Sequence, residues 1–119
     1  MERLKHRTDF LAAATGVKVP AAAFVLQARR RGDEAPPRMG FTVSKKVGTA
    51  VERNRVRRRL RDLVRRCAPV RMVVGHDYVL VGRRAALQLP FDRLMADFEG
   101  ALRRAHGKQR ARPAGESTT

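Results

Sequence analysis

Arginines crowd one short segment of the sequence, from position 53 to position 66. They are Arg53, Arg55, Arg57, Arg58, Arg59, Arg61, Arg65 and Arg66. A guanidinium group is planar, binds two phosphate oxygens at once and stacks on bases. Only Asp62 lies among these arginines and Glu52 just before them, whereas a solvated helix face normally mixes the two signs of charge. The segment therefore predicts a surface that binds nucleic-acid phosphates.

The whole chain is strongly basic. Its 119 residues hold 27 Lys plus Arg against 11 Asp plus Glu, which gives a net charge of +16 and a pI near 11.8. Such an excess destabilises a compact chain by self-repulsion, and a bound polyanion relieves it. Nucleic acid is the leading partner and an anionic membrane surface the second. The simplest alternative is a solvated helix face whose arginines reflect genome composition.

The arginines are expected to lie on one helix from Thr49 to Cys67, because Pro69 stops it soon after. Thr49 and Glu52 form a capping box, in which each side chain accepts a hydrogen bond from the other residue's backbone amide. Apolar residues recur at spacings of three and four, at Val56, Leu60, Leu63, Val64 and Cys67. This stripe is expected to be buried. Asn54 is a poor helix former, so we expect it to hydrogen-bond RNA or a metal-bound water.

The remaining segments alternate between helices and strands. We expect a first helix over residues 8–14, capped by Thr8 and ended by Gly16, and then a link or short strand over 17–20. Strands over 21–30 and 38–44 are expected to pair as an antiparallel hairpin. After the arginine helix we expect a strand over 77–81 and a last helix over 90–106, ended by Gly107. This order is typical of an α+β domain with a small sheet covered on one face by helices. We expect one RNA-binding domain over residues 1–106 and a disordered basic tail over residues 107–119.

Side chains for metal binding or catalysis are not clustered in the sequence. No spacing such as CxxC or HxxxH joins the possible ligands His6, His76, His106 and Cys67. The acidic residues Asp92, Asp97 and Glu99 spread around one predicted helix, whereas a two-metal nuclease needs converging carboxylates. We therefore expect no catalytic residue, no metal site and no cofactor bound by the protein itself.

The apolar runs of the sequence are short. None approaches the roughly 20 residues of a transmembrane helix, and the first seven residues lack the apolar stretch of a signal peptide. Cys67 is the single cysteine, so no disulfide forms within the chain. We expect a cytoplasmic protein without a membrane partner.

One segment resembles the signature of the bacterial ribonuclease P protein subunit. Residues 40–58 read GFTVSKKVGTAVERNRVRR. The family carries a strand, then Ser-Lys-Lys, Val or Ile, Gly, and a helix with an Arg-Asn-Arg core. Weaker similarity extends over Arg3-Leu4-Lys5, Asp9-Phe10, residues 24–26, and residues 77–81 with Arg83. From Gly107 onward nothing matches the family.

This resemblance implies an α/β sandwich with a four-stranded mixed sheet and a left-handed βαβ crossover. It also implies a non-catalytic subunit of an endoribonuclease, in which the catalytic RNA supplies the active site and binds Mg²⁺. The protein then binds that RNA, and it binds the single-stranded 5′ leader of precursor tRNA between the sheet and the first helix. No DNA partner is expected. The expected RNA-binding residues are Lys45, Lys46, Arg53, Asn54, Arg55, Arg57, Arg58, Arg61, Arg65 and Arg83, with Phe10 and Ser44 in the leader cleft.

Three positions depart from the family pattern. Ala14 and Gln27 stand where relatives often carry aromatic residues, and Thr49 stands where they carry Asn. Leader binding is then expected to depend on Phe10, backbone contacts and charge, unless Phe10 is a core residue of the first helix. Two other functions stay open, a ribosomal or other structured-RNA-binding protein and a free-standing ribonuclease.

Overall fold

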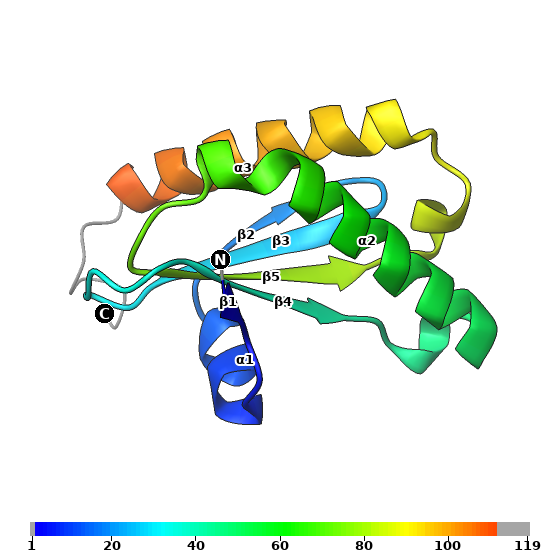
Figure 1. Cartoon of the computed structure of the whole chain (residues 1–119), viewed down its shortest axis with the longest axis horizontal. Coiled ribbons are helices and arrows are strands. Elements are labelled where there is room, and N and C mark those ends of the chain that lie inside the picture. The colour runs from blue at the N-terminus through cyan, green and yellow to red at the C-terminus, as the bar shows by residue number, and fades with distance from the viewer. Residues whose placement is uncertain (1, 112–119) are drawn as a thin grey trace.

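A five-stranded mixed sheet lies at the centre of the computed structural model, which describes residues 2–111 (Figure 1). The elements in chain order are β1 (Glu2–Arg3), α1 (Arg7–Ala13), β2 (Val17–Pro20), β3 (Phe24–Arg30), β4 (Arg38–Thr42), the 3-10 turn η1 (Lys45–Val47), α2 (Ala50–Arg71), β5 (His76–Gly82), the 3-10 turn η2 (Arg84–Leu87) and α3 (Phe91–Ala111). The predicted α+β class is confirmed. The sheet has five strands rather than four, because the two-residue strand β1 adds to one edge.

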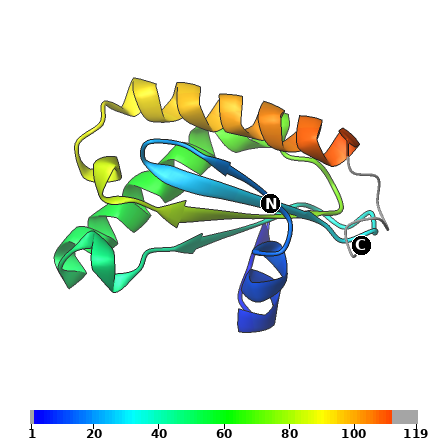
Figure 2. The same cartoon turned by 180° about the vertical axis from the view of Figure 1, so that it is seen from behind.

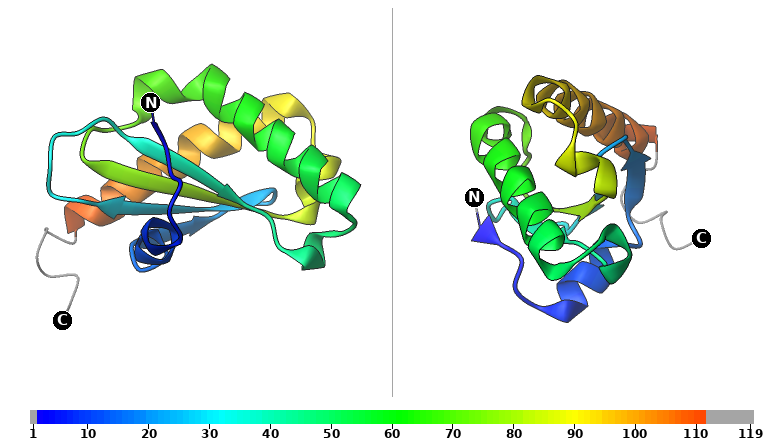
Figure 3. Two further views of the ribbon diagram at one scale, coloured as in Figure 1. Left: turned by 60° about the horizontal axis from the view of Figure 1, so that its bottom comes forward. Right: turned by 90° about the vertical axis from the view of Figure 1, so that its right-hand side faces the viewer.

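The strands lie in the order β1-β4-β5-β3-β2. β4 runs parallel to both β1 and β5, whereas β3 runs antiparallel to both β5 and β2. Helix α2 connects the parallel strands β4 and β5. This crossover is left-handed (Figure 3), as the resemblance implies and against the usual right-handed rule.

The predicted hairpin between residues 21–30 and 38–44 is wrong. β5 lies between β3 and β4, so that Leu80 pairs with Leu26 on one side and with Phe41 on the other. The reason lies in β5 itself, where Val79 and Leu80 point to opposite faces and are both buried. A strand that is apolar on both faces gains most at the centre of a sheet.

Helices cover both faces of the sheet, which corrects the prediction that they lie on one. α2 and α3 pack on one face, and α1 crosses the other (Figures 1 and 2). The main core lies under α2 and α3 and includes Phe24, Leu26, Tyr78 and Leu80 together with Phe98 of α3. A smaller cluster of Leu4, Ala13 and Val79, with Phe10 and Val81 packed against it, lies under α1.

The first two α-helices differ from the sequence prediction at their ends. α1 begins at Arg7, with His6 rather than Thr8 at the N-cap position. α2 continues through Pro69 to Arg71 instead of stopping near Cys67. Proline was expected to end that helix because it lacks an N–H donor, but here the chain keeps helical geometry for two further residues.

α3 continues to Ala111, so the predicted helix end at Gly107 and the predicted disorder of residues 107–111 are wrong. Gln109 is only 6% exposed. Its backbone carbonyl accepts a hydrogen bond from Arg30, and its side-chain oxygen forms one with Nε2 of His76 (3.1 Å). Lys108 Nζ donates to the carbonyl of Lys18 (2.8 Å). These contacts dock the last turn on the sheet. Residues 112–119 of the predicted tail lie outside the described residues.

A chain that ends after Gly107 should therefore be less stable than the full chain. Losing the hydrogen bonds to Arg30 and His76 is expected to lower the free energy of unfolding by about 1–3 kcal/mol, at roughly 1 kcal/mol per bond plus lost packing. A chain that ends after Ala111 keeps these contacts and should match the full chain. Urea denaturation of the three proteins measures the difference, and equal midpoints would contradict the docking of the last turn.

Candidate RNA-binding surface

Helix α2 begins with the predicted capping box. The amide of Thr49 donates to Glu52 Oε1 (2.9 Å), and the amide of Glu52 donates to Thr49 Oγ1 (3.2 Å). Arg84 Nη2 also donates to the Glu52 carboxylate (2.9 Å). The hydrogen bonds from Arg84 and Thr49 lower the pKa of Glu52 to about 2. Glu52 therefore stays ionised near neutral pH and holds the first turn of the helix in place.

The outward side of α2 carries five of the predicted RNA-binding residues. The buried stripe is the predicted one, Val56, Leu60, Leu63, Val64 and Cys67. The opposite side exposes Asn54, Arg55, Arg58, Arg61 and Arg65. Of these, Arg61 lies over the ring of Phe41 (5.9 Å to its centre), and Arg65 donates to Asp62 (2.5 Å). The helix thus presents a row of exposed cations with Asn54 beside them.

Arg53 and Arg57, also predicted to bind RNA, lie half-buried on one flank of α2. Arg53 Nη1 donates to the carbonyl of Gly48 (3.1 Å), and Arg57 Nη1 donates to Oδ1 of Asn54 (3.1 Å). A guanidinium has five N–H donors, so one bond leaves most of each group able to bind a ligand. These contacts orient both arginines and the Asn54 amide.

The other flank of α2 holds arginines that support the fold. Arg59 donates to the carbonyls of Ala86 (2.5 Å) and Leu89 (2.9 Å), which attaches α2 to the segment that leads into α3. Arg66 lies over the ring of Phe91, 4.9 Å from its centre. Neither was among the predicted RNA-binding residues. Helical periodicity alone cannot separate them from the exposed arginines, because it does not show which elements pack along the flanks.

The basic turn before α2 is held by Arg84. Arg84 Nη1 donates to the carbonyl of Val47 (2.7 Å) while its other terminal nitrogen binds Glu52. Gly48 has a φ of 155°, and a Cβ there would overlap the Glu52 carboxylate. Ser44, Lys45 and Lys46 are exposed on this turn, next to the start of α2 (Figure 1). Arg83 is exposed too and donates to the carbonyl of Ala21 (2.8 Å).

The sheet face that α1 crosses is only partly covered. Phe10 is half-buried and packs where Gly40 leaves room, since a Cβ on Gly40 would overlap its ring. Alternation along the strands places further half-buried side chains on the same face, at Val25, Gln27, Thr42 and Val81. We call these four residues with Phe10 the open sheet face. The sequence prediction found only Phe10 of this set, because the strand pairing that unites the others was not known.

The possible metal ligands of the described chain do not gather into a cluster, although the rings of His76 and His106 are in contact (5.9 Å between their centres). Within residues 2–111, no three His, Cys, Asp or Glu side chains come together in a way that could hold a metal ion. Asp97 pairs with Arg93 on the surface of α3 (3.1 Å), and burial raises the pKa of the Cys67 thiol. Over the same residues, no helix is both long enough and apolar enough to span a membrane.

Comparisons with known proteins agree on one family. The family model described as Ribonuclease P matches residues 1–106. The chain is 49% identical over 104 residues to the ribonuclease P protein component of Gluconacetobacter diazotrophicus, covering 87% of this chain and 90% of that one. A Staphylococcus aureus RNase P protein mutant with defective mRNA degradation activity is 27% identical with a TM-score of 0.73, covering 87% of both chains. The RNase P protein from Thermotoga maritima is 28% identical with a TM-score of 0.72, covering 87% and 97%. The chain therefore belongs to the ribonuclease P protein family.

Proposed function

We propose that the chain binds two different RNA segments on two separate surfaces. The outward side of α2, with Lys45 and Lys46 of the basic turn before it, binds the catalytic RNA of ribonuclease P. The open sheet face binds the single-stranded 5′ leader of precursor tRNA, so that the complex removes the leader at the correct bond. A ribosomal or other structured-RNA-binding protein, the alternative that the sequence left open, is not favoured, because the family is that of a ribonuclease P component.

The observation that carries the first part is the row of exposed cations on α2. Arg58 and Arg65 are seven residues apart, which corresponds to about 10 Å along the helix at 1.5 Å per residue. That spacing lets them reach different phosphates of a folded RNA. Asn54 adds a neutral hydrogen-bonding group held by Arg57 (3.1 Å), suited to a phosphate oxygen or a 2′-hydroxyl.

The second part is supported by the chemistry of the open sheet face. Its side chains are mainly apolar, and Phe10 offers an aromatic ring at its border with α1. Bases of a single strand can lie on such a surface, whereas those of an A-form duplex are stacked inside the helix. Stacking on one aromatic side chain is worth about 1–3 kcal/mol per base. The leader of precursor tRNA is the single-stranded part of that substrate, and mature tRNA lacks it.

We further propose that the chain carries no active site and that the catalytic RNA binds the Mg²⁺ ions. This part is supported by the arrangement of the possible ligands within residues 2–111, where no three His, Cys, Asp or Glu side chains converge, since phosphodiester cleavage with two metals needs converging ligands. The reaction takes place where tRNA is made in bacteria, so the proposed location is the cytoplasm. The similar S. aureus protein is a mutant described as having defective mRNA degradation activity, so a cleavage assay of the protein without the catalytic RNA is the direct test.

Changing Phe10 to Ala should weaken the binding of precursor tRNA to the reconstituted complex by about 1–3 kcal/mol and leave the binding of mature tRNA unchanged. Leu11→Ala is the matched control, because Leu11 is the next residue of α1 and is 56% exposed. Equal weakening of the binding of both tRNAs would show that Phe10 acts only as a core residue.

Purified protein without the catalytic RNA should not cleave precursor tRNA. Mg²⁺-dependent cleavage that is lost on changing Asp97 would overturn the assignment of the active site to the RNA.

A further inference from the structure

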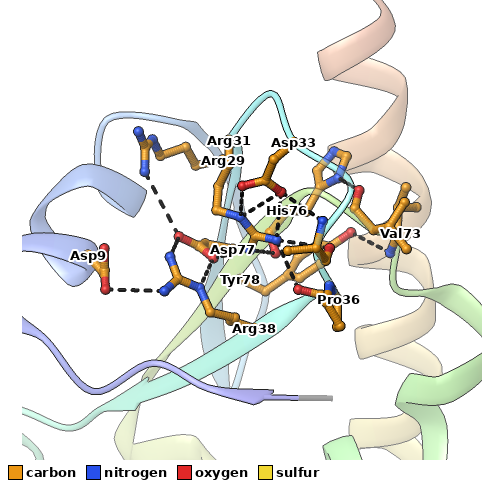
Figure 4. A network of polar contacts seen from close by, with 12 residues as sticks. Asp9, Arg29, Arg31, Asp33, Pro36, Arg38, Val73, His76, Asp77 and Tyr78 are labelled. Carbon is orange, nitrogen blue, oxygen red and sulfur yellow. Dashed lines mark hydrogen bonds and ion pairs between the residues drawn. The ribbon is translucent and has the colours of Figure 1, made fainter.

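Arg38 connects helix α1 to a buried carboxylate of the sheet (Figure 4). Asp77 in β5 is completely buried. Arg38 Nε donates to Asp77 Oδ1 and Nη2 donates to Oδ2, both at 2.8 Å, so the two groups pair through two parallel hydrogen bonds. The remaining nitrogen, Nη1, donates to Oδ2 of Asp9 in the first turn of α1 (3.4 Å). One guanidinium therefore joins three elements, β4, β5 and α1.

The guanidinium of Arg38 cannot easily turn away from α1. The two hydrogen bonds to Asp77 fix its plane, and Arg31 Nη1 holds the same carboxylate from the other side (2.5 Å). Its third nitrogen thus points to the first turn of α1 in a fixed direction. A flexible surface cation would lose conformational entropy on pairing with Asp9, but Arg38 is already ordered.

Helix α1 needs contacts of this kind. It has seven residues, and helices shorter than about 12 residues are marginal in isolation. No side chain caps its N-terminus. Its apolar contacts are small, with Ala13 against Leu4 and Val79 and with Phe10 on Gly40. Asp9 is the acidic residue of its first turn, where negative charge also favours the helix dipole.

We propose that Asp9 and Arg38 are positioning residues that hold α1 against the sheet so that Phe10 and the open sheet face together bind a single strand of RNA. The inference rests on the proposed leader-binding function of that face. Because α1 forms the border of the face, loosening its first turn moves Phe10 away from the strands. The basic side of α2 lies across the sheet from α1 and is not affected (Figure 1).

Asp9→Ala tests the proposal, with Asp33→Ala as its matched control. Asp33 belongs to the same network and accepts hydrogen bonds from Arg31 (3.1 to 3.2 Å), but it lies on the β3–β4 loop and forms no hydrogen bond or ion pair with Arg38 or with α1 in the described part of the chain. Both changes remove one negative charge. Alanine is also the better helix former, so weaker binding by Asp9→Ala cannot be due to lower helix propensity.

In the reconstituted complex, Asp9→Ala should reduce the ratio of precursor to mature tRNA affinity by about 2- to 5-fold, the range of a partly exposed ion pair. Asp9→Glu should restore most of it, and Asp33→Ala should match the wild type. Affinity for the catalytic RNA should be the same in all variants. An unchanged ratio in Asp9→Ala, an equal loss in Asp33→Ala, or equal weakening of both tRNAs would overturn the proposal.

Hydrogen exchange separates this proposal from the function on which it rests. The amides of Phe10 and Ala14 donate to the carbonyls of His6 and Phe10 in the first and last turns of α1. Both amides should exchange faster in Asp9→Ala than in the wild type or Asp33→Ala. Unchanged exchange would refute the positioning role whatever the tRNA affinities are. A wild-type complex that binds precursor and mature tRNA equally would instead refute leader binding by the open sheet face, even where exchange in α1 responds to Asp9.

Discussion

Changing Arg55, Arg58 and Arg61 together to Gln should flatten the salt dependence of binding to the ribonuclease P RNA. Each phosphate that a cation neutralises contributes roughly −0.7 to −0.9 to the slope of log K against log salt concentration, because bound counterions are released. Three contacts therefore correspond to a change of about two to three in the slope. All three side chains are exposed on the outward side of α2. Titrations of labelled RNA at several salt concentrations give the slope directly.

A matched triple variant on α3 provides the control for net charge. Arg93, Arg103 and Arg104 are exposed and their change to Gln removes the same three charges, so the slope should change by less than about one. Equal flattening by both triples would mean that binding follows the net charge of the protein. No flattening by the α2 triple would move the RNA-binding site to another surface, with Lys45 and Lys46 the first candidates.

The same α2 triple should not unfold the protein. Like charges three or four residues apart on a helix repel by a few tenths of a kcal/mol per pair, so their removal should leave the thermal midpoint unchanged or slightly raised. Asn54→Ala should behave differently, with lower affinity at an almost unchanged slope, since a neutral side chain releases no counterions. A slope change for Asn54→Ala would show that it acts by reorienting Arg57, to which it is bonded.

The helix that carries the cations could be predicted because its signals are local. The capping box joins residues three positions apart, Thr49 and Glu52, and the buried stripe repeats every three or four residues. Neither depends on the rest of the fold. The predicted end of the same helix was wrong, because the preference of proline against a helix interior is a tendency and not a rule, and Pro69 lies within α2.

The strand order could not be derived in the same way. Residues 21–30 and 38–44 follow one another in the chain, and their order favoured pairing as a hairpin with a long loop over residues 31–37. The structure instead places β5 between these two strands. β5 pairs with β3 across a long distance in the sequence, since the paired residues Arg30 and His76 are 46 positions apart. The strand order depends on which strand is apolar on both of its faces, because that strand gains most from a central place in the sheet. The left-handed crossover was expected only from the family resemblance, since general packing rules favour the opposite hand.

The polar residues that hold the sheet and α1 together were also missed. Asp77 appeared only as the first residue of a predicted strand, although its partners Arg31 and Arg38 lie 46 and 39 positions earlier in the chain. A basic chain offers many arginines as possible partners for any one carboxylate. The strand register places Arg38 opposite Asp77, with Arg29 on the other side. Arg31 follows β3 directly and reaches the same carboxylate from there.

Asp77→Asn should be among the most destabilising single changes in the protein. The carboxylate is completely buried and accepts from two arginines, of which Arg31 is only 9% exposed. Removing one partner of a buried ion pair typically costs about 3–5 kcal/mol, because the other charge stays buried without compensation. Asp33→Asn, which removes an exposed partner of Arg31, should cost much less. Urea denaturation at pH 7 compares the two variants, and similar losses would contradict the structural role of Asp77.

The pH dependence of that difference gives a second, independent test. Burial alone would raise the pKa of Asp77, but hydrogen bonds from Arg38 and Arg31 outweigh it and hold the pKa below its ordinary value of 3.8. The unfolded chain then binds a proton at a higher pH than the folded chain does. The stabilisation from the Asp77 carboxylate is therefore complete above about pH 4 and is lost as pH falls through the lower pKa of the folded state.

The pKa values of Glu52, Asp33 and Asp62 are lowered as well, but these groups are present in both wild type and Asp77→Asn, so their effects cancel in the comparison. The gap in unfolding free energy between wild type and Asp77→Asn should thus be constant from pH 5 to 8 and shrink below about pH 4. A gap of unchanged size down to pH 2 would mean that the amide's lost hydrogen-bond acceptor, and not the lost charge, destabilises the variant.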